Sequence, residues 1–320
     1  MDRPHLPLVT VFGASGFVGT QVVQALARKG HRIRAAVRRP DLAQHLRTQG
    51  DVGQIVAVQA NIRFPDSVAR AVEGAGIVIN LVGVGFERGA QNFELVNAAG
   101  ARAVAAAARA AGARTLVQMS ILGADPDSPS AFARSRARGE AAVLEAFPGA
   151  YVMRPSIVFG NGDGFVSRMA SMARFFPVLP LIGGRTRLQP VYVGDVADAI
   201  AAAAQGRAPG NVYELGGPEV LTHRALMQLI LRETGRSNLL VPVPAGIGSL
   251  LALPLSILPT PVLTGDQVKL LQVDNVVSAQ AMSANRTLAA FGVTPTPLEA
   301  VLPSYIWRFR RNGQFDRLPA

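Results

Sequence analysis

A short apolar run, Leu8–Phe12, leads directly into three spaced glycines, Gly13, Gly16 and Gly19. An amphipathic segment, Phe17–Arg28, begins among these glycines, and its apolar residues recur at the spacing of a helix. A strand, a glycine turn and a helix in this order form a βα unit. Because apolar runs and helical segments keep alternating through the first half of the chain, the sequence predicts a parallel sheet with helices on both faces.

The predicted elements divide the chain into a regular first half and a less regular second half. The strands expected in the first half are Leu8–Phe12, His31–Val37, Ile55–Ala60, Ile77–Val82, Thr115–Ser120 and Tyr151–Val158, with helices at Phe17–Arg28, Ala90–Ala111 and Ser130–Phe147. In the second half we expect helices at Gly194–Gln205 and Thr222–Thr234 and a strand at Val212–Leu215. The fold class is therefore α/β, with a Rossmann-like doubly wound sheet over 1–160. Residues 186–216 return to it, and 161–320 form a smaller, mainly helical lobe.

Composition excludes several classes of chemistry. The chain has no cysteine, which excludes disulfides, thiolate metal sites and a cysteine nucleophile. Its four histidines lie far apart in sequence, so we expect no metal site. The formal net charge of +11 suits an acidic partner or an anionic membrane face. Nucleic acid is not expected, because no basic run with interleaved aromatic residues precedes the C-terminal region.

The glycine turn is the strongest functional signal. Glycines after a strand let the backbone approach a pyrophosphate, and the helix N-terminus offers N–H groups to it. The residues of this turn that we expect to bind a dinucleotide are Gly13, Ser15, Gly16, Phe17 and Val18, with Gly19 completing the motif. A tight turn without a ligand is the alternative.

The end of the second strand indicates which dinucleotide is bound. Proteins that use NAD usually place an acidic residue there to bind the ribose 2′-hydroxyl. This chain has Arg38 and Arg39 instead, and guanidinium groups bind a 2′-phosphate well. The sequence therefore favours NADP(H), unless one or both arginines are ordinary surface charges.

Other candidate positions follow from topology, since ligands of such sheets bind at the carboxyl ends of the strands. Adenine is expected near the end of the third strand. The remaining ends would surround the rest of the dinucleotide. The positions selected in this way are Asn61, Ile62, Leu81, Val82, Gly83, Ser120, Pro155 and Ser156.

The glycine turn, the fourth-strand end and the run Arg154–Gly160 together resemble the extended and atypical short-chain dehydrogenases, and 191–197 matches a further motif of that superfamily. In active members a Ser, a Tyr and a Lys four residues after the Tyr carry the reaction. The resemblance places Ser120 at the Ser position, Phe132 at the Tyr position and Arg136 at the Lys position. Arg136 would then line the nicotinamide end of the cofactor site.

Phe132 and Arg136 cannot replace the Tyr and Lys chemically. Phenylalanine has no proton to transfer, and arginine stays charged, so it binds ribose or phosphate without acting as an acid or base. We therefore expect no catalytic residues and no enzymatic turnover. Two alternatives stay open, namely a misaligned helix and a substitute group elsewhere in the chain.

Six segments resemble a narrower family, the NADPH-binding accessory subunits of respiratory complex I in their bacterial form. These segments are Met153–Gly160, Phe175–Gly184, Gln189–Ala197, Tyr213–Val220, Asp266–Ser278 and Leu298–Phe309. The resemblance implies a tightly held structural NADPH and a peripheral-arm position near the membrane, with other complex I subunits as partners. It also implies a peripheral location on the cytoplasmic face of the bacterial inner membrane.

Two features of the second half agree with docking. The segment 239–263 is apolar but interrupted by prolines, so it suits a membrane interface or a partner better than a spanning helix, and the core of the small lobe is the alternative. The tail 301–320 alternates aromatic residues with arginines, a composition typical of interface anchors. A solvated basic tail is the alternative there.

Two other functions stay open. The first is an active NADP-dependent reductase or epimerase with an unusual acid–base group. The second is a redox sensor similar to the NmrA-like regulators, which would bind the dinucleotide reversibly. The start of the chain has no apolar stretch typical of a signal peptide, so we expect it to fold in a cytoplasm-like compartment.

Overall fold

A computed structural model describes residues 6–248 and 263–315. The chain forms two compact units, and each is built from segments that are separate in sequence. Unit 1 comprises Met1–Pro155, Gly194–Leu215 and Ala279–Thr294, and unit 2 comprises Ser156–Val193, Gly216–Ser278 and Pro295–Ala320.

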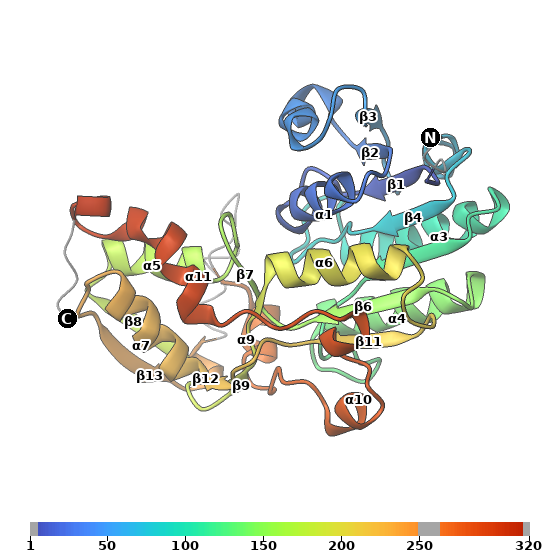
Figure 1. Ribbon diagram of the computed structural model, residues 1–320. Coiled ribbons are helices and arrows are strands. Elements are labelled where there is room, and N and C mark those ends of the chain that lie inside the picture. The colour runs from blue at the N-terminus through green and yellow to red at the C-terminus, as the bar shows by residue number, and fades with distance from the viewer. Residues whose placement is uncertain (1–5, 249–262, 316–320) are drawn as a thin grey trace. The chain divides into compact units, whose positions relative to one another are not determined.

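Unit 1 is organised around a seven-stranded sheet with the order β11-β6-β5-β4-β1-β2-β3, and every neighbouring pair is parallel (Figure 1). The strands are β1 (Val9–Phe12), β2 (Ile33–Val37), β3 (Ile55–Gln59), β4 (Ile77–Asn80), β5 (Thr115–Met119), β6 (Tyr151–Pro155) and β11 (Val212–Leu215). The strand order reverses between β1 and β4, which is where doubly wound sheets bind their ligands.

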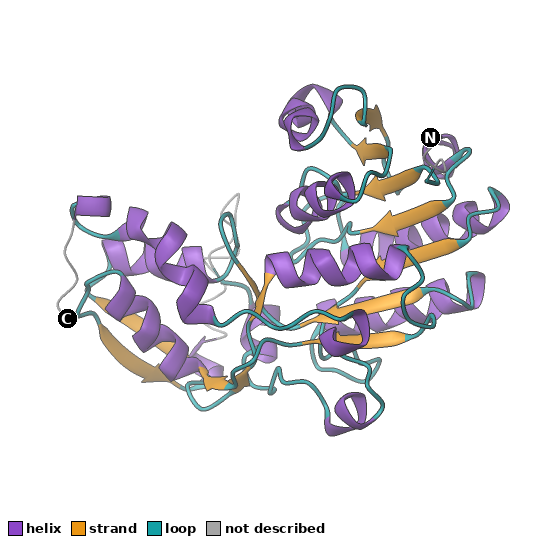
Figure 2. Ribbon diagram, viewed as in Figure 1, coloured by secondary structure: helices purple, strands orange, loops and turns teal. Residues whose placement is uncertain are grey.

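Helices cover both faces of this sheet (Figure 2). On one face α2 (Pro65–Val72), α3 (Gly100–Ala110) and α4 (Ala131–Ala146) share a core with the sheet, formed largely by alanine, valine and leucine side chains. On the other face lie α1 (Phe17–Arg28) and α6 (Val193–Ala204) (Figure 1). Because alanine side chains are small, these helices approach the sheet closely. The predicted doubly wound Rossmann-like fold is confirmed.

Short helical turns complete unit 1. The 3-10 segment η1 (Pro40–Gln49) joins β2 to β3, and α10 (Ala279–Ser283) with η3 (Leu288–Phe291) belong to the last segment of the unit. That segment adds to the sheet edge at β11, where Glu214 N–H donates to the carbonyl oxygen of Arg286 and the Phe291 ring packs 4.6 Å from Tyr213.

The helix expected over Ala90–Ala111 is more complex than the sequence suggests. A π-helical segment, η2 (Glu94–Ala99), precedes α3, and α4 packs closely against it. A Cβ atom at Gly139 of α4 would lie 2.2 Å from the carbonyl oxygen of Asn97, so glycine is required for this approach. The wider π-helical turn places Asn97 between α4 and the loop that follows β4.

The described residues of unit 2 form three small two-stranded sheets. They pair β7 (Val158–Phe159) with β10 (Val191–Tyr192), β9 (Arg187–Leu188) with β12 (Leu221–Thr222), and β8 (Val178–Ile182) with β13 (Leu239–Val243). The helical elements are α5 (Val166–Phe175), α7 (His223–Glu233), α9 (Gly265–Leu270), α11 (Leu298–Ile306), η4 (Trp307–Phe309) and η5 (Gly313–Phe315). Helices α5, α7 and α11 share one apolar core.

Local sequence signals place the ends of α7 well. The Thr222 hydroxyl accepts a hydrogen bond from the Ala225 N–H at 3.1 Å, and Gly235 past the other end has a φ of +61°. Both agree with the predicted N-cap and C-terminal glycine. The expected sixth strand Tyr151–Val158 is instead divided, because β6 ends at Pro155 and the chain passes into unit 2 at Ser156.

The apolar segment 239–263 is described in part. Its first residues form β13, and 249–262 lie outside the described residues, as do 316–320 of the expected tail. Across the part of the chain that the structure describes, no helix combines the length and apolar character that crossing a bilayer requires.

Candidate functional site

The glycine turn after β1 is tightly folded. Gly13 has a φ of +76°, and its carbonyl oxygen accepts a hydrogen bond from the Gly16 N–H at 3.1 Å. A Cβ atom at Gly19 would lie 2.1 Å from the Gly13 carbonyl oxygen, so a side chain there would force α1 away from the turn. Gly16 caps α1 without a side-chain hydrogen bond, which leaves the first N–H groups of the helix available to an anion.

A cavity of about 250 Å³ lies at the carboxyl ends of β1 to β4 in unit 1. It brings together nine of the residues that the sequence selected. These are Gly13, Ser15, Gly16, Arg38, Asn61, Ile62, Leu81, Val82 and Gly83. The cavity therefore extends from the glycine turn toward the ends of β2 and β3 on one side and of β4 on the other.

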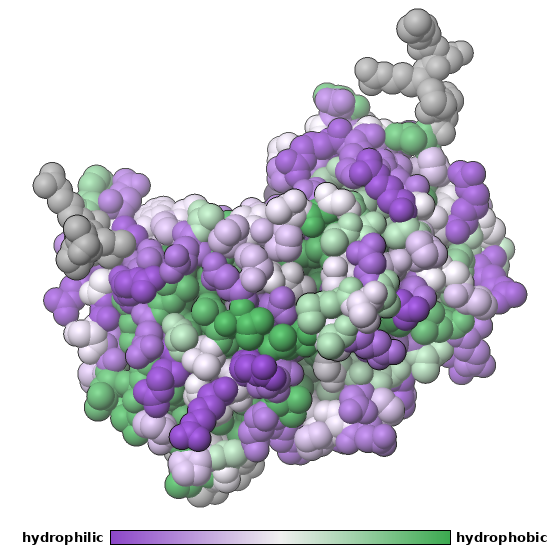
Figure 3. All heavy atoms as spheres, turned by 60° about the horizontal axis from the view of Figure 1, so that its bottom comes forward, coloured by the Kyte–Doolittle hydropathy of each residue, from purple (hydrophilic) through white to green (hydrophobic). Residues whose placement is uncertain are grey.

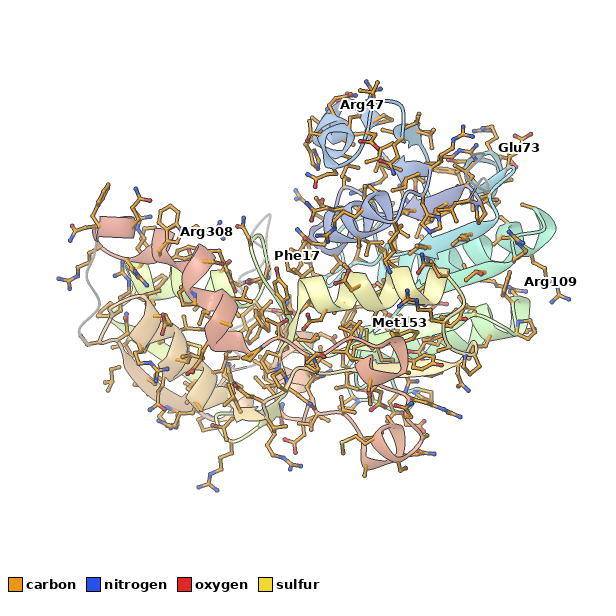
Figure 4. All side chains as sticks on the ribbon, viewed as in Figure 1. Phe17, Arg47, Glu73, Arg109, Met153 and Arg308 are labelled. Carbon is orange, nitrogen blue, oxygen red and sulfur yellow. The ribbon has the colours of Figure 1, made fainter. Side chains whose placement is uncertain are left out.

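The two adjacent arginines after β2 differ in their surroundings. Arg38 lines the cavity, and its Nη1 donates to Gln91 Oε1 at 2.6 Å. Arg39 does not line the cavity and forms an exposed ion pair with Asp41 at 3.1 Å. Phe17 and Val18 form the half-buried first turn of α1 beside the glycine turn and are not among the lining residues; Figure 4 labels Phe17 there.

The cavity includes polar residues that sequence reasoning missed. Arg63 lines it, and its Nη1 donates to the Ala90 carbonyl oxygen at 3.0 Å. Gln91 also lines it and accepts the hydrogen bond from Arg38. Arg63 directly follows the predicted pair Asn61 and Ile62, and its N–H donates to the Asn61 side chain at 3.2 Å. The signal that points to Arg63 is therefore its place one position past the pair predicted at the end of β3.

Buried amides fix the loop after β4. Asn80 donates to Gln118 at 2.8 Å and accepts from the Val82 N–H at 3.1 Å. Asn97 accepts from the Val84 N–H at 3.1 Å and donates to the Ser135 hydroxyl at 3.0 Å. Because Val82 and Val84 both line the cavity, these amides hold one wall of the site in place.

Ser120 and Arg136 lie at the end of β5. The buried Ser120 Oγ and Arg136 Nε have no hydrogen-bond partner within the described protein. The Arg136 Nη1 donates to the Met119 carbonyl oxygen at 3.2 Å. A Cβ atom at Gly83 would lie 1.8 Å from Arg136 Nη2, so the guanidinium lies directly against a residue that lines the cavity.

Phe132 lies one helical turn before Arg136 on α4, whose N-terminus Ser130 caps. The Arg136 Cζ lies 5.3 Å from the centre of the Phe132 ring, and Phe93 packs at 5.6 Å on the same ring. The ring is thus held between an aromatic group and a cation. Neither neighbour gives this position a group that can transfer a proton.

The tyrosine hydroxyls of unit 1 form hydrogen bonds away from the cavity. Tyr151 and Tyr213 lie near the beginnings of β6 and β11, which is the opposite edge of the sheet from the cavity. Their hydroxyls donate to the carbonyl oxygens of Ala208 and Pro209, respectively. They are therefore not placed to act at the ends of β4 and β5.

Pro155 and Ser156 fall on opposite sides of the boundary between the units. Pro155 ends β6 in unit 1, and Ser156 begins unit 2. The Ser156 hydroxyl bonds to Asn275, with 2.5 Å between its Oγ and the Asn275 Oδ1. Within the described residues, His, Asp and Glu side chains nowhere gather in the groups of three or more that hold a metal ion.

Comparisons with known proteins extend over nearly all of the chain. Residues 8–246 match the family described as the RmlD substrate binding domain. The mitochondrial NADH dehydrogenase [ubiquinone] 1 alpha subcomplex subunit 9 of Arabidopsis thaliana is 35% identical over 96% of this chain and 79% of its own length. A ceramide reductase of Caulobacter vibrioides is 35% identical over 61% of this chain and 60% of its own length.

The fold also matches solved structures at lower identity. A crystal structure of an NADPH-dependent quinone oxidoreductase from Escherichia coli, complexed with NADPH, superposes with a TM-score of 0.73. It covers 92% of this chain and 98% of its own at 22% identity, which supports the fold alone. The similarity to the alpha subcomplex protein is higher and spans both units. The chain therefore belongs to the family of NADH dehydrogenase alpha subcomplex subunit 9, within the wider group of atypical short-chain dehydrogenase-like proteins.

Proposed function

We propose that the protein is a non-catalytic accessory subunit of NADH:quinone oxidoreductase that holds one NADPH as part of its structure. The observation that carries this proposal is the glycine-turn cavity, with Arg136 against its wall and Phe132 on the same helix. The sequence resemblance assigns these two residues to the positions of the catalytic Tyr and Lys. Such a site binds a dinucleotide and lacks the group that would pass a proton to a substrate. Its family relationship supports the assembly with complex I subunits.

The residues present fit a dinucleotide. The Gly13–Gly19 turn brings backbone close to the cavity, and the first N–H groups of α1 suit a pyrophosphate. Ser120 Oγ and Arg136 Nε are buried and have no hydrogen-bond partner among the described residues, as expected for groups that bond to a ligand. When bound, NADPH supplies a nicotinamide that can donate hydride. Here the protein groups would bind and orient the cofactor.

Two guanidinium groups favour NADPH over NADH. Arg38 lines the cavity at the end of β2, where a 2′-phosphate would lie, and Arg63 lines it near the end of β3. Both project flexible, charged donors that suit a phosphate group. The assignment of NADPH therefore depends on Arg38, with Arg63 as a second contributor and Arg39 as a surface residue.

Unit 2 carries a surface suited to docking. Phe175, Phe176 and Leu239 are 69%, 57% and 62% exposed, and Val178 and Val241 lie beside them on the β8–β13 pair. We refer to these five residues as the β8–β13 face. Figure 3, turned by 60° from the view of Figure 1, shows apolar surface interspersed with polar residues. An exposed apolar group of this kind marks an interaction site in a soluble protein.

Arginines accompany the β8–β13 face. A second cavity of about 300 Å³ is lined by Phe175, Phe176, Arg174, Arg236 and Arg311 and, among the described residues, by no carboxylate. Aromatic side chains with arginine are enriched in protein interfaces. We therefore assign this face to neighbouring complex I subunits close to the anionic cytoplasmic surface of a bacterial inner membrane.

The tail contributes less to docking than its composition suggests. Arg308, labelled in Figure 4, donates to Asn161 and Ser167, and Arg310 donates to the Glu233 carbonyl oxygen. These arginines hold the tail on unit 2 itself. Trp307 and Phe315 stay exposed and extend the docking surface, whereas Arg317 lies outside the described residues.

Native electrophoresis of mildly solubilised membranes tests this function, with mass spectrometry of each band and extraction of bound nucleotide. The expected result is that the chain migrates with NADH:quinone oxidoreductase subunits and carries close to one NADPH. Migration alone in the soluble fraction with exchangeable nucleotide would reject the accessory role and favour an NmrA-like sensor.

An active reductase is the second candidate. It is favoured by the similarity to the ceramide reductase, which covers 61% of this chain. If it were correct, the purified protein would oxidise its NADPH when given a long-chain ketone. The Phe132 position predicts no such oxidation above the rate of the free cofactor. If NADPH is oxidised and the oxidation is lost when a residue lining the cavity is substituted, the protein is a reductase instead.

A further inference from the structure

The guanidinium of Arg136 is fixed in one place. Its Nη1 donates to the Met119 carbonyl oxygen at the end of β5, and its Cζ lies over the Phe132 ring, 5.3 Å from the ring centre. Gly83 leaves the space that the group fills, because a Cβ atom there would lie 1.8 Å from Nη2. The charge is thus held against the cavity wall by three different elements.

The carboxylate nearest to Arg136 in sequence is paired with another arginine. Glu140, one turn after Arg136 on α4, forms a bidentate pair with Arg154 of β6, with distances of 2.9 Å from Nε to Oε1 and 2.5 Å from Nη2 to Oε2. Burial lowers the pKa of Arg136 to about 10, and the charge of Glu140 opposes this effect. Arg136 therefore stays cationic at neutral pH with its charge incompletely balanced.

Arg136 lies on the nicotinamide side of the proposed cofactor site. In doubly wound sheets the adenosine half lies over the β1–β2–β3 side and the other half over the β4–β5 side. Gly83 and Val84 line the cavity at the end of β4. At the end of β5 lies the buried Ser120 Oγ, which has no hydrogen-bond partner in the part of the chain that the structure describes. In a bound dinucleotide, the ring whose charge changes on oxidation would therefore lie on the side of the fixed charge.

We propose that Arg136 makes this cavity selective for the reduced dinucleotide, so that NADPH binds more tightly than NADP⁺. When NADPH loses a hydride, its uncharged dihydronicotinamide ring becomes a cation. Two like charges in a partly water-excluded site repel each other strongly. The proposal rests on the proposed function, since it needs a dinucleotide in the cavity.

Competition between the two redox forms tests the proposal. The full-length protein is equilibrated with equal concentrations of NADPH and NADP⁺ until the bound ratio is constant, excess is removed by gel filtration, and the released nucleotides are quantified by chromatography. The wild type is expected to retain NADPH over NADP⁺ by about tenfold or more. Arg136→Met is expected to bring this ratio close to one.

Three further variants separate charge from other effects. Arg136→Lys keeps the positive charge and should keep the NADPH preference, and Arg136→Gln is a second neutral variant in case Arg136→Met does not fold. Ser120→Ala removes an uncharged donor at the same end of the cavity. It should weaken both redox forms alike and leave their ratio unchanged.

The outcomes distinguish this proposal from the one on which it depends. A wild-type ratio near one, or a neutral variant with the wild-type ratio, overturns the selectivity while dinucleotide binding stands. A wild-type protein that retains neither nucleotide shows that the proposed cofactor function itself is wrong, and the selectivity falls with it. A preference for NADPH that disappears in the neutral variants and persists in Arg136→Lys supports the proposal.

Discussion

At the scale of single residues, neighbouring positions in the sequence have unequal roles in the structure. Arg38 and Arg39 are identical in type and adjacent, yet one lines the cavity and the other pairs with Asp41 at the surface. The cause is the direction of the chain after β2, which turns one side chain inward and the next outward. The sequence predicted that both arginines bind the 2′-phosphate. From the structure we expect this binding to depend on Arg38 alone of the two.

Arg38→Ala should lower the affinity for NADPH by about tenfold to a hundredfold, because a charge-assisted hydrogen bond to phosphate is worth about 1.5–3 kcal/mol. NADH affinity should change little. Titration of both nucleotides checks this. Arg39→Ala is the matched control and should bind NADPH like the wild type; equal losses in the two variants would contradict the assignment.

The burial of His223 makes the stability of the fold depend on pH. It is 4% exposed, its Nδ1 donates to the Ile182 carbonyl oxygen at 2.8 Å, and its Nε2 is buried without a partner in the described chain. Desolvation lowers the pKa of His223, and the hydrogen bond to Ile182 opposes this shift. The folded protein therefore binds a proton less readily than the unfolded chain.

The free energy of unfolding should consequently fall as the pH drops below about 6.5, the ordinary pKa of histidine, and through the lower pKa of the folded state. Urea titrations at pH 7.5 and pH 5 measure this loss. His223→Gln should show a smaller loss, while the exposed His45→Gln should match the wild type. An unchanged pH dependence in His223→Gln would refute this account.

At the scale of elements, unit 1 depends on how α4 meets its neighbours. Gly139 allows α4 to approach the π-helical segment η2, and Glu140 joins it to β6 through Arg154. Glu140 is 6% exposed and Arg154 is 25% exposed at the side chain, so water screens their pairing poorly. A pair of this kind is costly to break by removing one partner.

Glu140→Gln should lower the free energy of unfolding by about 3 kcal/mol, since it leaves Arg154 partly buried without its counter-charge. Glu94→Gln offers a matched control. It breaks the exposed pair with Arg138, whose distance is 2.7 Å, and should cost under about 1 kcal/mol. Denaturant unfolding of both variants decides the point, and equal losses would show that the α4–β6 pair contributes no more than a surface pair.

At the scale of the whole molecule, the two units provide different properties. Unit 1 contains the cavity, the glycine turn and the residues at the ends of the strands. Unit 2 contains the β8–β13 face with its arginines. This division separates the proposed cofactor binding from the proposed docking, so each can be disrupted while the other is kept.

Phe175→Ser combined with Phe176→Ser should detach the protein from the assembly while leaving its NADPH content unchanged. Large exposed aromatic residues carry much of the energy of an interface, so we expect affinity to fall by about thirtyfold or more. Native electrophoresis and nucleotide extraction measure the two properties. Leu42→Ser, at an exposed apolar residue of unit 1, is the control and should remain assembled.

The sequence by itself determined the sheet, the glycine turn and the strand-end positions around it. These depend on short-range patterns, because apolar periodicity and glycine spacing act within one element and its neighbour. For the same reason Thr222 and Gly235 identify the ends of α7. The sequence also predicted one helix over Ser130–Phe147, and Phe132 and Arg136 lie four residues apart on it.

The tertiary structure alone decided which residues share the cavity and which charges are balanced. Gln91 joins the site, and Asn97 supports its wall, through contacts between segments that are separate in the chain. The assignment of Arg38 to the cavity, of Glu140 to Arg154 and of Arg308 to the surface of unit 2 also depends on such contacts. Side-chain pairing across distant elements is set by packing, which no local pattern encodes.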